Sequence, residues 1–277
     1  YNEAMRVGQA ANCELSVYCV NDPDHEDAQN DEYRKLLRHA QSHRLAGIIF
    51  ATPPYPLAGS ALLKIPDMPR VAITTGRTVE GVSSIRLDSQ SFLDKALDRL
   101  ASLGRKRIAV IVSSNLPPES YQAIRDGIHR RGMILQDRWM QGLALRSPAW
   151  AKNVAELLMS SPPADRPDGL LIADDNFVEH AASGLVAGGV RVPQELDIVA
   201  HCNFPWPTPS VLPVMRLGYD TRDVLQACLD GISRQRRGEV LPKEIRRIEA
   251  VFEDELNVSA ASDAEGATPV NLNRSPE

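Results

Sequence analysis

Apolar residues occur along the chain in two patterns, as short continuous runs and as longer segments with helical spacing. Both occur in the stretch 168–203, DGLLIADDNFVEHAASGLVAGGVRVPQELDIVAHCN. Its apolar run at 169–173 predicts a buried parallel strand. The polar residues Asp174-Asp175-Asn176 directly after the run can serve as the N-cap of a helix over 177–185. A second apolar run at 196–200 predicts another strand. The stretch therefore predicts a strand, a helix and a second strand.

The same alternation of strand-like and helix-like segments covers most of the chain. Strands that alternate with helices and lack hairpin signals predict a parallel, doubly wound sheet of the α/β class. Further strands are predicted at 15–20, 47–50, 69–74, 82–87, 107–113, 138–143, 214–217 and 244–256. Further helices are predicted at 1–14, 33–40, 89–103, 119–131, 147–160 and 219–237. The segment 259–277 has no periodicity and little apolar content, which predicts a disordered tail.

Polar residues follow several of the predicted strands. In open α/β sheets, ligands bind beyond the carboxyl ends of the strands, so these residues are the candidates for a binding site. We expect a ligand to contact Thr75, Asp88, Ser114, Asp175 and either His201 or Asn203. For the two aspartates the alternative role is helix capping, because a carboxylate at a helix start accepts hydrogen bonds from the first turn.

The sequence lacks the common motifs of catalysis. It contains no Gly-x-Gly-x-x-Gly, no Gly-x-x-x-x-Gly-Lys-Ser/Thr and no Gly-x-Ser-x-Gly, and its six histidines have no metal-ligand spacing. The adjacent carboxylates of Asp174 and Asp175 are the one candidate acid–base pair, but carboxylates at a helix start are more often caps. We therefore expect a protein that is not an enzyme and that uses no cofactor and no metal.

Composition and charge narrow the class of protein further. A length of 277 residues suits about two globular units, and 43% hydrophobic with 24% charged residues is ordinary for a soluble protein. No apolar run approaches the ~18 residues that cross a bilayer, and the start YNEAMRVGQ does not resemble a signal peptide. The net charge of −5 argues against a DNA-binding surface in this part of the protein. We expect no membrane partner.

The four cysteines, Cys13, Cys19, Cys202 and Cys228, have no Cys-x-x-Cys spacing. They fall in strand-like or helix-like segments, which favours buried, reduced thiols over disulfides or a zinc site. This usage indicates a cytoplasmic protein.

Three segments resemble a known family. The order of strand, Asp-Asp-Asn, helix and RVPQELDIV at 191–199 is similar to the effector-binding domain of LacI/GalR-type transcription regulators. The segments VSSIRLD at 82–88 and LGRKRIAVI at 103–111 match the same family. The similarity covers about residues 1–258, and RVPQELDIV is its most specific part.

The resemblance implies a periplasmic-binding-protein-like fold of type 1, with two doubly wound parallel-sheet subdomains and a ligand cleft between them. It implies an N-terminal subdomain of residues 1–87 and 214–240, and a C-terminal subdomain of residues 88–213 and 241–258. It also implies a homodimer that binds a small-molecule effector and controls transcription allosterically. DNA would be contacted only through a helix-turn-helix headpiece, which this sequence does not include. The six candidate residues would then line the cleft.

Two positions depart from the family pattern. Ile124 stands where family members usually carry an arginine three residues before the glycine at Gly127, and Arg125 lies one place later, rotated by about 100° around the helix. Cys202 stands where the family usually has an aspartate that accepts a ligand hydrogen bond. From these two positions we expect an effector that is less polar than a free sugar, or a protein effector, or none; the sequence does not identify it.

One alternative has the same fold. A solute-binding protein of a transport system would share both subdomains and usually acts as a monomer. The RVPQELDIV segment and the four unpaired cysteines favour the regulator.

Overall fold

The computed structural model describes residues 2–20 and 31–256. The chain forms two compact units. The first unit comprises Tyr1–Phe92, Asn203–Trp206 and Tyr219–Ala250, and the second comprises Leu93–Cys202, Pro207–Gly218 and Val251–Glu277. The predicted tail at 259–277 lies outside the described residues. In the described part of the chain, no helix combines the length and the apolar character needed to cross a membrane.

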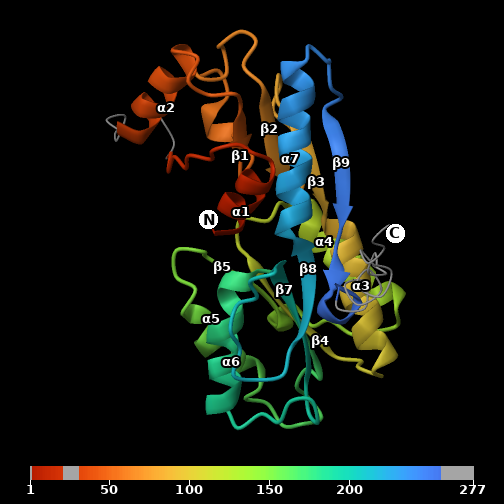
Figure 1. The fold of residues 1–277 in the computed structure, drawn as a ribbon. Helices are drawn as coiled ribbons and strands as arrows, with labels where there is room; N and C mark the ends of the chain where they lie inside the picture. The colour runs from red at the N-terminus through yellow and green to blue at the C-terminus, as the bar shows by residue number, and fades with distance from the viewer. Residues whose placement is uncertain (1, 21–30, 257–277) are drawn as a thin grey trace, which may run out of the picture. The chain divides into compact units, whose positions relative to one another are not determined.

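The first unit contains a four-stranded parallel sheet in the order β1-β2-β3-β9. Its strands are β1 (Ile48–Phe50), β2 (Arg70–Thr74), β3 (Ser83–Asp88) and β9 (Glu244–Glu249). Its helices are α1 (Asn2–Ala10), α2 (Asp31–Gln41) and α7 (Thr221–Arg236), with a 3-10 turn at η1 (Tyr55–Leu57). Helix α7 packs against α1, β2 and β3 (Figure 1). A separate apolar cluster consists of Leu36, Ala40, Ile48, Leu57, Leu62 and Met68.

The second unit is built on a six-stranded sheet in the order β10-β8-β7-β6-β4-β5. Its strands are β4 (Ile108–Ser113), β5 (Met140–Leu143), β6 (Gly169–Ile172), β7 (Asp197–Phe204), β8 (Met215–Asp220) and β10 (Val251–Phe252). The pairs β4–β5, β4–β6 and β6–β7 are parallel, and β10 runs antiparallel to β8. Its helices are α3 (Ser89–Ser102, which starts in the first unit), α4 (Pro118–Arg130), α5 (Trp150–Leu158) and α6 (Val178–Ala187), with 3-10 turns at η2 (Asp137–Trp139) and η3 (Asp175–Phe177). The predicted α/β class with mainly parallel, doubly wound sheets is confirmed.

Residues 15–20 do not form the predicted strand. The structure assigns no strand between residues 13 and 20. Tyr18 and Val20 still pack against the cluster around Leu36, whereas Val17 is 57% exposed. The alternating pattern therefore identified side chains that face a core, but a strand also needs a hydrogen-bonded neighbour, and the described chain provides none here.

The predicted strand at 244–256 is two strands in two sheets. β9 pairs with β3 in the first sheet, and β10 pairs with β8 in the second. Between them the amide of Ala250 donates to the hydroxyl of Ser91 (3.0 Å) instead of to a strand. Residues 241–250 therefore belong to the first unit, whereas the sequence-based boundary placed them in the C-terminal subdomain.

Charged side chains tie together the amino ends of the central strands in the second unit. The carboxylate of Asp168 accepts the backbone amides of Lys106 (2.9 Å) and Arg107 (2.7 Å), which fixes the start of β4 against the start of β6. The Arg105 guanidinium donates to the carboxylate of Asp197 (2.6 Å) and to the carbonyl of Pro193 (2.5 Å). The segment RVPQELDIV thus has a structural role, because it supplies both acceptors for Arg105.

Helices α5 and α6 approach each other closely at Gly184. A Cβ atom added at Gly184 would lie 2.2 Å from the carbonyl oxygen of Lys152. Only a residue without a side chain fits at this crossing, which fixes the distance between the two helices.

We predict that Gly184→Ala lowers the free energy of unfolding by about 2 kcal/mol, because the new methyl group must push backbone apart. Urea denaturation measures the change. Gly188→Ala is the matched control, since its Cβ would meet no atom closer than 3.5 Å. An equal effect of both substitutions would contradict the crossing argument.

Candidate functional site

Thr75 is exposed directly after β2. The turn around it is held by the buried neighbour Thr74, whose hydroxyl accepts the amide of Gly76 (3.0 Å) and donates to the carbonyl of Arg77 (3.1 Å). The turn is thus satisfied without Thr75, which leaves the Thr75 hydroxyl available to a ligand.

Asp88 is the last residue of β3 and the N-cap of α3. Its carboxylate accepts the amides of Gln90 (3.1 Å) and Ser91 (3.2 Å), so the predicted capping role is confirmed. The phenol of Tyr219 is buried and interacts electrostatically with Asp88. Burial raises the pKa of Tyr219, and the negative charge of Asp88 raises it further. The phenol is therefore a neutral hydrogen-bonding group beside the candidate carboxylate.

Sequence analysis missed Tyr219. It was counted in a helix at 219–237, but the structure places it in β8, one residue before the N-cap of α7 at Asp220. Asp220 caps by accepting the amide of Arg222 (2.9 Å). The sequence does contain a signal for this boundary, because aspartate is a typical N-cap residue. With Asp220 as the cap, the helix begins after it and Tyr219 lies outside the helix.

Asn203 is exposed and opens a short segment of the first unit that contains Phe204 and Trp206. Its carbonyl accepts the amide of Trp206 (3.1 Å). The Trp206 indole donates to the carboxylate of Glu3 (3.1 Å), which is only 6% exposed, and the guanidinium of Arg6 lies 5.7 Å from the Trp206 ring centre. Phe204 is buried, but Trp206 is 57% exposed, so these two aromatic residues play different structural roles.

Ser114 is exposed directly after β4 in the second unit. Its amide donates to the carbonyl of Leu143 (2.8 Å), which extends the β4–β5 pairing by one residue. The hydroxyl therefore lies at the predicted end of a parallel strand.

Asp175 and His201 lie together in the second unit. His201 Nδ1 is 3.9 Å from Asp175 Oδ1, and both side chains are mostly buried. Asp174, one residue earlier, is the N-cap of η3, because its carboxylate accepts the amide of Asn176 (3.0 Å). Burial lowers the pKa of His201, and the charges of Asp175 and then Asp174 oppose that shift.

The expected positions of His201 and Asn203 after a strand are wrong. Both lie inside β7, which continues to Phe204 instead of ending near residue 200. After Ala200 burial alternates along the strand, because Cys202 and Phe204 are buried whereas His201 and Asn203 are more exposed, so the continuous apolar run ends before the strand does.

Cys202 is a buried thiol that stays neutral at ordinary pH. Its side chain is 1% exposed, and burial raises the pKa of the thiol to about 12. The backbone beside it is equally crowded, since a Cβ at Gly218 would lie 1.7 Å from the Cys202 carbonyl oxygen. A neutral thiol thus occupies the position where the resemblance to LacI/GalR-type regulators implied a carboxylate.

The second departure from the family also leaves an apolar position. Ile124 is buried on α4, and the neighbouring Arg125 pairs with Asp137 (2.8 Å). Arg125 therefore does not take over the role of the usual arginine. Among the described residues, no group of three or more His, Cys, Asp and Glu is arranged to hold a metal ion.

The structure thus brings Asp175 and His201 together in the second unit, with Ser114 directly after the neighbouring strand β4. In the first unit it places Thr75 and Asp88 at the ends of the adjacent strands β2 and β3. A ligand-binding role for these residues stays a prediction.

A model of the periplasmic binding protein-like domain family matches residues 97–247, just over half of the chain. No curated protein sequence matches. Similar solved structures include a LacI family transcriptional regulator from Lactobacillus casei with bound sucrose (17% identity, TM-score 0.70, 91% of each chain covered). A putative ribose operon repressor from Burkholderia thailandensis (19%, 0.67, 91% of each chain) and a LacI family regulator from Mycobacterium smegmatis (18%, 0.66, 90% of each chain) share the fold.

We predict that His201 makes stability depend on pH. Because its pKa is lower in the folded than in the unfolded chain, its contribution is fully present above about pH 6.5 and is lost as the pH falls through the folded-state value. Wild type should therefore lose more stability than His201→Phe between pH 7 and pH 5, measured by urea denaturation. His129→Phe, at the exposed end of α4, should behave as wild type. Identical pH profiles for wild type and His201→Phe would contradict this prediction.

Proposed function

Because the chain belongs to the periplasmic binding protein-like domain family, we propose that it is the effector-sensing and dimerisation domain of a LacI/GalR-like transcription regulator. The observation that carries the proposal is the placement of polar side chains at the carboxyl ends of parallel strands in both units, where α/β sheets bind ligands. The fold shared with LacI-family regulators and the RVPQELDIV segment support it further. In this role the chain binds its ligand without converting it.

Ile124 and Cys202 favour an effector less polar than a free sugar, but five other polar side chains lie at or near the strand ends in the two units. We therefore propose that the effector is a small neutral molecule rich in hydroxyl groups. Asp88 and Asp175 accept hydrogen bonds from such groups, and Thr75, Ser114 and Asn203 add neutral polar contacts. An anionic ligand would be repelled by the two carboxylates, and Arg125 is held by Asp137. The Lactobacillus casei regulator was crystallised with sucrose and with glucose, which are ligands of this class.

Regulation follows if the effector favours one arrangement of the two units over another. A ligand shifts such an equilibrium only by the difference between its affinities for the two states. A coupling of about 1–3 kcal/mol is typical and changes the affinity for DNA about 5- to 150-fold. DNA would be contacted by a headpiece outside this chain.

We propose that the chain dimerises through α5 and α6. Trp150 and Leu157 lie seven residues apart on the same side of α5, and both are exposed (61% and 70%). Val186 on the adjoining α6 is also 51% exposed. Exposed apolar side chains that gather on a rigid helix pair are typical of protein interfaces.

For the effector we expect sucrose or glucose to raise Tm and glucose 6-phosphate to have no effect. Asp88→Asn and Asp175→Asn should each weaken binding by calorimetry about tenfold or more, because each removes a charged acceptor. Asparagine also caps helices, so the Tm of Asp88→Asn without ligand should change little.

Asp254→Asn is the control for the loss of a carboxylate, since Asp254 pairs with Arg99 away from the strand ends. Unchanged affinity in Asp88→Asn, Asp175→Asn and Thr75→Val would remove these residues from the site. Preferential binding of the phosphorylated sugar would overturn the proposed ligand class.

For the dimer we expect sedimentation at micromolar concentration to give twice the chain mass. The double variant Trp150→Glu/Leu157→Glu should sediment as a monomer, because it places two charges in an apolar interface. Val211→Glu, at an exposed valine outside α5 and α6, should stay dimeric. A wild-type monomer would instead favour a solute-binding protein.

A further inference from the structure

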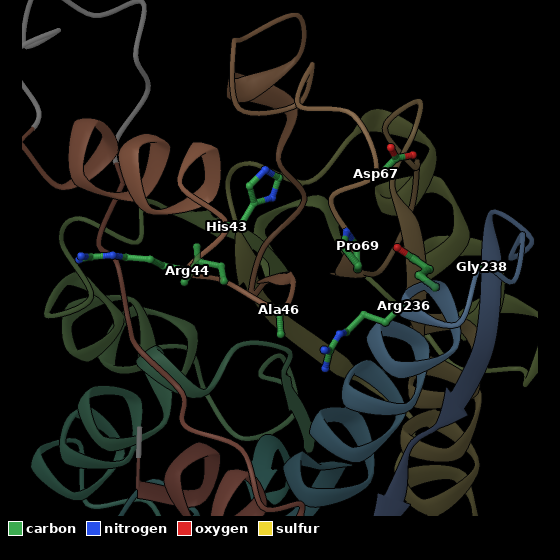
Figure 2. Close-up of a pocket in the computed structure, with 9 residues that line it drawn as sticks. His43, Arg44, Ala46, Asp67, Pro69, Arg236 and Gly238 are labelled. Atoms are coloured by element: carbon green, nitrogen blue, oxygen red, sulfur yellow. The ribbon is translucent and has the colours of Figure 1, made fainter.

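A basic hollow opens in the first unit at the amino ends of its strands, away from Thr75 and Asp88. It has a volume of about 630 Å³, and its polar lining consists of His43, Arg44, Asp67, Gln235 and Arg236. Figure 2 shows that these residues come from the turn after α2, the segment before β2 and the end of α7. A smaller neighbouring hollow of about 350 Å³ shares His43 and adds Lys64. The volume is within the range of small-molecule sites.

Positive charge exceeds negative charge around this hollow. Arg44, Lys64 and Arg236 line the two hollows, and Asp67 is the one carboxylate in either lining. The carboxyl ends of α2 and α7 point to the same region, but two helix ends together contribute only roughly one negative charge. The helix ends and Asp67 together do not neutralise Arg44, Lys64 and Arg236. The region is therefore basic, although the whole chain carries a net charge of −5.

Arg70, behind the wall of the hollow, adds a further cation. Its side chain is buried, and its guanidinium donates to the carbonyls of Leu62 (3.3 Å) and Ile65, not to a carboxylate. Its Nε has no hydrogen-bond partner among the described residues. Burial lowers the pKa of Arg70, yet arginine stays charged in proteins. No carboxylate of the described residues pairs with this guanidinium, so its charge raises the electrostatic potential in the adjoining hollow.

The walls of the hollow are held rigidly. The side-chain amide of Gln235 accepts the amide of Arg70 (2.7 Å) and donates to its carbonyl (3.0 Å), which fixes the end of α7 to the start of β2. His43 adopts a positive φ of 54° and ends α2 by donating its amide to the carbonyl of Ala40 (3.2 Å). In Figure 2 the Arg236 side chain extends toward Ala46, while Arg44 points away from the other labelled residues. Arg236 is thus the cation best placed to contact a ligand.

We propose that the basic hollow binds a small molecule carrying several phosphate groups, at a site separate from the proposed effector site. A guanidinium forms paired hydrogen bonds with phosphate oxygens, and His43 and Lys64 supply further donors. Several linked phosphates match the two adjoining hollows better than a single anion does, because cations line both.

Titration calorimetry with inorganic tripolyphosphate at constant ionic strength tests the site. Arg236→Ala should raise Kd about tenfold or more, and Arg236→Lys should raise it less. Arg237→Ala is the matched control, since it removes the same charge from the next residue of the same helix end but does not line the hollow. It should change Kd by no more than about twofold.

Three outcomes would overturn the proposal. The first is no binding of tripolyphosphate at millimolar concentration. The second is equal weakening by Arg236→Ala and Arg237→Ala, which would indicate unspecific attraction by the helix end. The third is binding of a 20-base-pair DNA duplex that depends on Arg236 while tripolyphosphate fails to compete, which would assign the hollow to nucleic acid. None of these results bears on sugar binding, so the two proposals stand or fall separately.

Discussion

The contacts of Asp168 and Arg105 determine which side chains reach the carboxyl end of the second sheet. Asp168 holds the start of β6 to the start of β4, and Arg105 holds β7 to the same place through Asp197. From there the three strands run in register, with Ile111, Ile172 and Ala200 at the same level. Ser114, Asp175 and His201 follow these positions and therefore emerge at one edge. A slip of one residue would turn every side chain of a strand to the other face.

The sequence predicted the class of fold, because buried parallel strands give continuous apolar runs that are easy to recognise. The sequence-based prediction failed where a strand-like pattern of buried side chains does not coincide with strand hydrogen bonding. The segment 15–20 has a strand-like pattern but no strand, and β7 continues past its apolar run through His201. The split at Ala250 depends on a single side-chain contact with Ser91, a residue far away in the sequence. Such long-range contacts leave no local pattern.

The sequence predicted which residues belong to the candidate site, but it did not predict which of them lie together in space or which of them cap helices. Asp88 and Asp175 look alike in the sequence, since each begins a helical segment. In the structure Asp88 is itself an N-cap, whereas Asp174 is the N-cap of the turn that contains Asp175. The pairing of Asp175 with His201 arises from the adjacency of β6 and β7. The basic hollow had no sequence signal at all, because its cations Arg44 and Arg236 come from two distant segments whose charges look ordinary one at a time.

The hydrogen bonds of Gln235 give β2 a mechanical role. The side-chain amide pairs with the backbone of Arg70 as a neighbouring strand would, so the last turn of α7 is joined to one end of β2. The other end of the strand, about 16 Å away, leads into the turn that presents Thr75. A strand hydrogen-bonded on both sides resists stretching and bending. β2 is therefore a stiff connection between the two edges of the sheet. A displacement of the α7 end by even a fraction of an ångström would move the whole strand and, with it, the turn at the opposite edge.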